Sequence, residues 1–147
     1  MDTKQVVEDF TTAFQKGDME ACLTCLSDDF TFSGPVPKPL NAQEWMGTAA
    51  AMRAGFPDIN YNSKIVSVDG GKATVSTQLT GTHTADLDLS KMGLGINPAT
   101  GKSFSNPEEQ GVMTVANGKI SSYDITPVEG GGLMGLLGQL GISPPGP

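Results

Sequence analysis

The hydrophobic pattern of this chain changes its period near residue 59, and that change limits the possible folds more than any other feature. Before it, apolar residues recur every three or four positions, which predicts helices over 3–16, 18–26 and 41–56. After it, apolar and polar residues alternate in a way that predicts four long strands, over 59–68, 72–84, 108–116 and 119–128. Helices followed by a run of strands indicate an α+β domain with an antiparallel or mixed sheet.

Capping residues mark the ends of the predicted helices. Gly17 can end the first helix and Asp18 can begin the second. Asn41 with Glu44 three residues later forms a capping box for the third helix, which Pro57 then ends. Between the second and third helices, residues 29–33 alternate like a short strand.

Two tight turns set the predicted strand pairing. Asp69-Gly70-Gly71 joins the first two long strands, and Asn117-Gly118 is a strong signal for a two-residue hairpin loop. A two-residue loop predicts these pairs across the second hairpin: Val115–Ile120, Met113–Ser122 and Gly111–Asp124. In this register the Asp124 side chain shares the buried face of the sheet with Met113.

The charge balance excludes several classes of partner. Sixteen acidic residues against nine Lys and Arg give a formal net charge of −7. Such a surface repels phosphate backbones and anionic lipids, so we expect neither nucleic acid nor a membrane surface as a partner. The N-terminus lacks a signal-peptide pattern, and no apolar run reaches the ~20 residues of a membrane span, so a cytoplasmic location is expected.

The length of 147 residues fits one domain, predicted over 1–142 and followed by a disordered tail over 143–147. Before the tail, segment 130–142 places four leucines at helical spacing, but its glycines make a helix weak on its own. We expect this helix to dock on another surface, such as the mouth of a pocket.

No metal or cofactor site can be assembled from the residue pattern. The chain has a single histidine, His83, and its carboxylates are scattered. Cys22 and Cys25 fall inside a predicted helix, where a Cys-x-x-Cys pair is more typical of packing than of a redox or zinc site. We therefore expect neither a cofactor nor a metal.

Several short motifs are spread over almost the whole chain, and their order is more informative than any one of them. They are Gly17-Asp18, Asp28-Asp29-Phe30, Phe56-Pro57-Asp58, 79–84, 92–102, 117–120, Tyr123-Asp124 and 136–141. With helices first and a long meander after them, the chain resembles the nuclear transport factor 2-like superfamily and, within it, the SnoaL-like polyketide cyclases. The resemblance implies one domain in which a curved, cone-shaped sheet wraps around the N-terminal helices.

The resemblance also implies a chemistry. Such cyclases close a ring by an intramolecular aldol reaction without metal or cofactor, and an aspartate near the end of the last strands serves as acid and base. Asp124 matches that position. His83 lies at a strand end on the apolar face, which makes it a second candidate for moving a proton.

The apolar residues of the helices and sheet predict a pocket for a small hydrophobic molecule. Its predicted lining is Phe10, Phe14, Trp45, Met52, Leu79 and Met113. Two interpretations stay open. The first is a cofactor-free cyclase or isomerase acting on a polyketide-like carbonyl compound; a homodimer is a separate expectation that the resemblance implies. The second is a non-catalytic module of the same fold that binds an apolar ligand or only dimerises. The enzyme requires Asp124 and His83 to reach the pocket.

Overall fold

The predicted helices and strands occur in the predicted order, and three short strands between residues 87 and 105 that the sequence did not predict add to them. A computed structural model of the chain describes residues 2–34, 38–90 and 94–142, so the tail predicted over 143–147 lies outside the described residues. The helices are α1 (Thr3–Lys16), α2 (Met19–Cys25), α3 (Ala42–Gly55) and α4 (Gly132–Gln139). The strands are β1 (Leu26–Ser33), β2 (Lys64–Asp69), β3 (Lys72–Thr77), β4 (Thr80–Thr82), β5 (Leu87–Leu89), β6 (Gly95–Asn97), β7 (Ser103–Ser105), β8 (Glu109–Ala116) and β9 (Lys119–Ile125).

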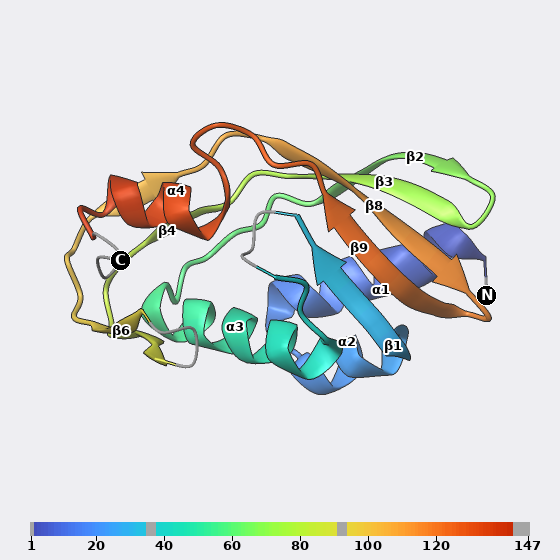
Figure 1. Cartoon of the computed structure of the whole chain (residues 1–147), viewed down its shortest axis with the longest axis horizontal. Coiled ribbons are helices and arrows are strands. Elements are labelled where there is room, and N and C mark those ends of the chain that lie inside the picture. The colour runs from blue at the N-terminus through green and yellow to red at the C-terminus, as the bar shows by residue number, and fades with distance from the viewer. Residues whose placement is uncertain (1, 35–37, 91–93, 143–147) are drawn as a thin grey trace.

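Five strands form the main sheet, in the order β1-β9-β8-β3-β2. β1 runs parallel to β9, and the other neighbours are antiparallel, so the sheet is mixed and is not closed. α1, α2 and α3 lie along one face of this sheet, and α4 packs against β7 at the far end of the long strands (Figure 1). The predicted α+β class is confirmed.

The predicted helix signals act as expected. Asp2 and Asp18 accept hydrogen bonds from backbone N–H groups of the first turns of α1 and α2, and Asn41 and Glu44 form the capping box of α3. Gly17 ends α1 in the left-handed conformation, at φ 79°. Among the described residues, no helix is both long and apolar enough to cross a membrane.

The prediction of two uninterrupted strands over 59–68 and 72–84 is wrong. The first begins only at Lys64, and the second divides into β3 and β4. The reason is a change of partner, because β3 pairs with β8 whereas β4 pairs with β7. The alternation of apolar and polar residues shows which face of a strand is buried, but it does not show which other strand pairs with it.

A bulge in the β8–β9 hairpin corrects the predicted register. The Val115–Ile120 pair is confirmed, but one residue of β9 is then left over, and the next pairs are Thr114–Ser122, Met113–Tyr123 and Val112–Asp124. An extra residue moves every later side chain to the other face of the sheet. Tyr123 therefore turns to the buried face, whereas Asp124 is exposed on the opposite one.

The core is built around the only tryptophan, Trp45 on α3. The centroid of its ring lies 4.7 Å from that of Phe32 and 5.3 Å from that of Phe30, both nearly parallel to it. Three more aromatic rings surround it, those of Phe10, Phe14 and Tyr123. The two cysteines are free thiols on α2, and burial raises the pKa of Cys22 to about 12, as expected for a packing residue.

Candidate functional site

A cavity lies between α1 and α3 on one side and the sheet on the other. Its volume is about 120 Å³. A single water needs at least about 10–15 Å³, so the cavity has room for a small organic molecule. The residues that line it come from every part of the chain: Phe10, Thr11, Phe14, Phe32, Leu40, Trp45, Thr48, Ala49, Met52, Tyr61, Ser63, Val75, Thr77, Leu79, Glu109, Met113, Tyr123, Ile125, Gly132 and Leu133.

The structure brings the predicted apolar lining together. All six residues border this one cavity: Phe10, Phe14, Trp45, Met52, Leu79 and Met113. The helical residues reach it because each lies on the buried stripe of α1 or α3, and Met113 reaches it from the buried face of β8.

The C-terminal helix α4 forms one edge of the cavity through Gly132 and Leu133. Its Leu136 and Leu137 are buried, and Gln139 exchanges hydrogen bonds with the β7 region, donating to Asn106 Oδ1 at 3.0 Å and accepting from Ser105 N–H at 2.8 Å. A segment with weak helical propensity is thus held in place by docking, as predicted.

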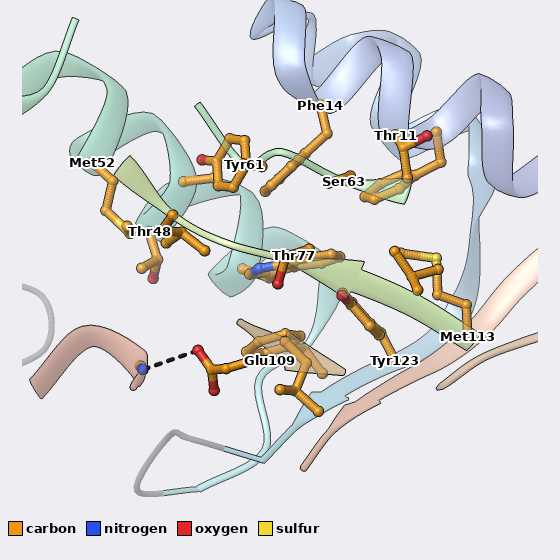
Figure 2. Close-up of a pocket in the computed structure, with 18 of the residues that line it drawn as sticks. Thr11, Phe14, Thr48, Met52, Tyr61, Ser63, Thr77, Glu109, Met113 and Tyr123 are labelled. Atoms are coloured by element: carbon orange, nitrogen blue, oxygen red, sulfur yellow. Dashed lines mark hydrogen bonds between the residues drawn. The ribbon is translucent and has the colours of Figure 1, made fainter. Parts of the chain in front are cut away.

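Glu109 places a carboxyl group in this apolar cavity. It is the first residue of β8 and is only 4% exposed. Its Oε1 accepts the backbone N–H of Gly132 at 3.1 Å, whereas Oε2 is buried with no hydrogen-bond partner in the described part of the chain. Glu109 lines the cavity, and Figure 2 shows its carboxyl group directed toward the first residue of α4, whose N–H is bound to it. Burial raises the pKa of Glu109, and the Gly132 N–H lowers it by a smaller amount.

The raised pKa predicts a pH-dependent stability. In the unfolded chain the Glu109 carboxyl has its ordinary pKa of 4.5, and in the folded chain its pKa is higher. The free energy of unfolding is therefore greatest below pH 4.5 and falls as the pH rises through the folded-state pKa. Glu109→Gln keeps an acceptor for Gly132 but cannot ionise. We expect the variant to be more stable than the wild type at neutral pH and equal to it below about pH 4. Urea unfolding of both proteins across this range measures the difference, and a less stable variant at neutral pH would contradict it.

Tyr123 contributes the second buried polar group at the cavity. Its Oη is buried, and none of the described residues forms a hydrogen bond of regular geometry with it. Burial raises the pKa of this phenol, the Thr77 side chain lowers it, and the charge of Glu109 raises it further. Figure 2 shows the Tyr123 hydroxyl directed toward Thr77, whereas the Glu109 carboxyl is directed toward the start of α4.

Gly111 leaves the space that the Tyr123 ring occupies. A Cβ at this position would lie 2.6 Å from Tyr123 Cε1 and 2.9 Å from the carbonyl oxygen of Asp124. Gly111→Ala is therefore expected to destabilise the fold by about 1–3 kcal/mol, because the backbone cannot move away freely. Gly47→Ala is the matched control, since a Cβ there, in the exposed part of α3, meets nothing within 4 Å. Thermal unfolding of both variants tests this, and equal stability of the two would contradict it.

Asp124 does not reach the cavity. It is exposed, and its carboxylate accepts a hydrogen bond from the Ser33 hydroxyl on the neighbouring strand β1. The bulge in β9 is the cause, because it turns Tyr123 inward in the place where the predicted register put Asp124. Asp124 therefore lacks the access to the cavity that the predicted acid/base role requires.

His83 is fully buried, but it does not line the cavity either. Its Nδ1 accepts the backbone N–H of Thr100 at 3.2 Å and lies 3.1 Å from the Thr100 hydroxyl. Since Nδ1 is an acceptor, the proton of the neutral ring is on Nε2. The ring meets Phe56 edge-on, with centroids 5.5 Å apart. These contacts hold the 98–102 segment against β4 and do not bring His83 and Asp124 together.

The sequence carried a signal for Glu109 but none for Tyr123. Glu109, Gly111 and Met113 alternate along one strand, so the buried face assigned to Met113 also contains Glu109. Tyr123 could not be placed on that face, because its position depends on a bulge that the strong Asn117-Gly118 turn gives no sign of.

Comparison with known proteins identifies the family and the fold. The SnoaL-like domain family matches residues 7–123. The chain belongs to that family. Among curated proteins, none matches the sequence significantly.

Solved structures show the same fold. IdmH, a candidate polyketide cyclase from Streptomyces antibioticus, is 20% identical with a TM-score of 0.70, over 97% of this chain and all of that one. A candidate polyketide cyclase from Xanthomonas campestris is 17% identical with a TM-score of 0.70, over 94% and 96%. AclR, a candidate hydroxylase from Streptomyces galilaeus, is 17% identical with a TM-score of 0.70, over 97% of both chains. The nuclear transport factor 2-like fold is thus confirmed for this SnoaL-like chain, and the fold alone does not decide between activities.

Proposed function

We propose that this SnoaL-like protein binds a small, largely apolar carbonyl compound and catalyses a cofactor-free proton transfer on it, of the kind used in ring closure or isomerisation. One observation carries the proposal: the Glu109 carboxyl group borders a mostly apolar cavity and keeps one oxygen, Oε2, without a partner among the described residues. A buried carboxyl with a raised pKa is suited to accept and return a proton near neutral pH.

The chemistry is balanced without any further reagent. The Glu109 carboxylate removes a proton from the carbon next to a carbonyl group, and the electrons of that C–H bond form an enolate. In an isomerisation the same proton returns to another atom of the substrate. In a ring closure the enolate carbon bonds to a second carbonyl carbon of the same molecule, whose oxygen takes the proton. Either route regenerates the carboxylate.

The Gly132 N–H supports this role by holding the carboxyl in one orientation. It occupies Oε1 at 3.1 Å and leaves Oε2 for the substrate. Because Gly132 is the first residue of α4, the docked C-terminal helix positions the proposed acid/base residue. In this proposal Glu109 takes the part that family resemblance implied for Asp124.

A two-stage measurement tests the proposal. Enolisable ketones of one or two rings are first screened for an increase in melting temperature, and each ligand found is then incubated with the protein in deuterium oxide. We expect the hydrogens next to the carbonyl to exchange faster than in buffer, as followed by NMR. Ligands that bind but never exchange faster would overturn catalysis and favour the binding module. The homodimer stays a separate prediction, tested by the molecular mass in solution.

A further inference from the structure

One wall of the cavity consists of aromatic side chains that are fixed by packing against one another. The ring centroids of Phe14 and Tyr61 lie 4.5 Å apart, and those of Phe14 and Trp45 lie 5.1 Å apart. Phe10 stacks on Phe14, and all four side chains are buried. Close-packed side chains of this kind move aside only at a cost in packing energy. We therefore do not expect this wall to give way to a larger ligand.

The helix α4 forms another boundary of the cavity, through Gly132 and Leu133. Both residues are only half-buried, and Leu133 packs against the edge of the core. Because glycine has no side chain, Leu133 supplies the side chain that α4 places at the cavity. Figure 2 shows the start of α4, bound to Glu109, on one side of the cavity and Met113 on the other. The α4 boundary is thus distinct from the buried end at Met113.

Hydrogen bonds to the preceding residue set the position of Leu133. The Gly132 N–H donates to Glu109 Oε1 at 3.1 Å, and the Gly132 carbonyl oxygen accepts from Asn106 Nδ2 at 3.0 Å. Asn106 is 1% exposed, and its Oδ1 accepts from the Gln139 side chain at the other end of α4. Leu133 therefore follows directly after the residue that binds the proposed acid/base group. We expect a substrate at Glu109 to lie beside the Leu133 side chain.

The volume of the cavity, about 120 Å³, fits a single ring, because an apolar cavity on the order of 150 Å³ holds benzene. We propose that Leu133 sets this limit: the cavity takes an apolar ketone with one ring, and the Leu133 side chain occupies the space into which a second, fused ring would extend. This inference rests on the proposed function, because it names the size class of the substrate for the same cavity and the residue that determines it.

Two ketones that differ by one fused ring test the size limit. Cyclohexanone is a six-membered ring ketone, and 1-tetralone is the same ring ketone fused to a second ring. NMR titration of the isotope-labelled full chain gives both dissociation constants. Without a size limit the larger, more apolar ketone would bind more tightly. We expect it to bind the wild type about tenfold more weakly than cyclohexanone. Equal or tighter binding of 1-tetralone, or no binding of cyclohexanone, would overturn the inference.

Leu133→Ala tests whether this side chain sets the limit. The variant opens space at the α4 boundary, so 1-tetralone should bind it at least as tightly as cyclohexanone does. Met134→Ala is the matched control, because Met134 is the next residue of the same helix and is 50% exposed. The control should keep the preference of the wild type for cyclohexanone. An unchanged preference in Leu133→Ala, or the same change in both variants, would overturn the assignment to Leu133.

Leu133→Val covers the case in which the alanine variant fails to fold. It keeps a branched apolar side chain and removes only one methylene group, so α4 should remain docked. The affinity for 1-tetralone relative to cyclohexanone should rise above that of the wild type and stay below that of Leu133→Ala. Cooperative unfolding of each variant is checked first. A folded Leu133→Val variant with the preference of the wild type would contradict the inference.

The outcomes separate this inference from the proposed function. Preference for cyclohexanone without hydrogen exchange in either ketone would uphold the size limit and overturn catalysis. Hydrogen exchange that depends on Glu109, with equal binding of cyclohexanone and 1-tetralone, would uphold catalysis and overturn the size limit.

Discussion

Glu109→Gln is expected to lower the rate of enzyme-dependent hydrogen exchange by about 10²–10⁴-fold, the usual contribution of a positioned acid/base group. Glutamine is close in size to glutamate and keeps an oxygen for the Gly132 N–H, so the docking of α4 is preserved. It cannot accept the substrate proton at neutral pH. The ketone should therefore still raise the melting temperature of the variant, and only kcat should fall.

Asp124→Asn is the matched control for this experiment. It makes the same change, from carboxylate to amide, at the position that family resemblance implies for catalysis. Because Asp124 is exposed and bound to the Ser33 hydroxyl, we expect its rate to stay within about twofold of the wild type. The reverse pattern, with a large loss at Asp124 and none at Glu109, would refute the assignment of the acid/base role to Glu109.

Trp45→Ala is expected to destabilise the fold by about 3–5 kcal/mol. The Trp45 side chain is 7% exposed and touches aromatic rings from α1, β1 and β9, so its removal opens a hole where the helices meet the sheet. The ring also borders the cavity, which would widen. Both effects come from lost contacts that the surrounding backbone can only partly replace.

Chemical denaturation measures this loss, and Val66→Ala serves as the control. Val66 lies on the edge strand β2 and is 51% exposed, so its truncation should change the free energy of unfolding by less than about 0.5 kcal/mol. A Trp45→Ala variant as stable as Val66→Ala would show that the aromatic cluster does not hold the helices on the sheet.

The exposed position of Asp124 shows why a shared fold is a weak guide to the residues that line a cavity. The three solved structures described above, two candidate cyclases and a candidate hydroxylase, are 17–20% identical to this chain. At such distances the backbone path is kept while side chains change. A one-residue bulge is then enough to replace a carboxylate with a phenol at a given place in the cavity.

The sequence by itself determined the order and type of the main elements and the apolar wall of the cavity. Helical spacing places Phe10, Phe14, Trp45 and Met52 on buried stripes, and strand alternation places Met113 on the buried face, because side-chain direction follows from local backbone geometry. The same alternation places Glu109 on the buried face, because it lies two residues before Gly111 on the same strand.

Only the tertiary structure decided which polar groups line the cavity. The bulge before Ser122 turns Tyr123 inward and Asp124 outward, and the pairing of β4 with β7 keeps His83 away from the cavity. The docking of α4 through Gly132 completes the surroundings of Glu109 from a residue 23 positions away. These features depend on contacts between segments that are far apart in the chain. The hydrophobic periodicity of a segment reflects its own local structure and does not reveal which distant segment it contacts.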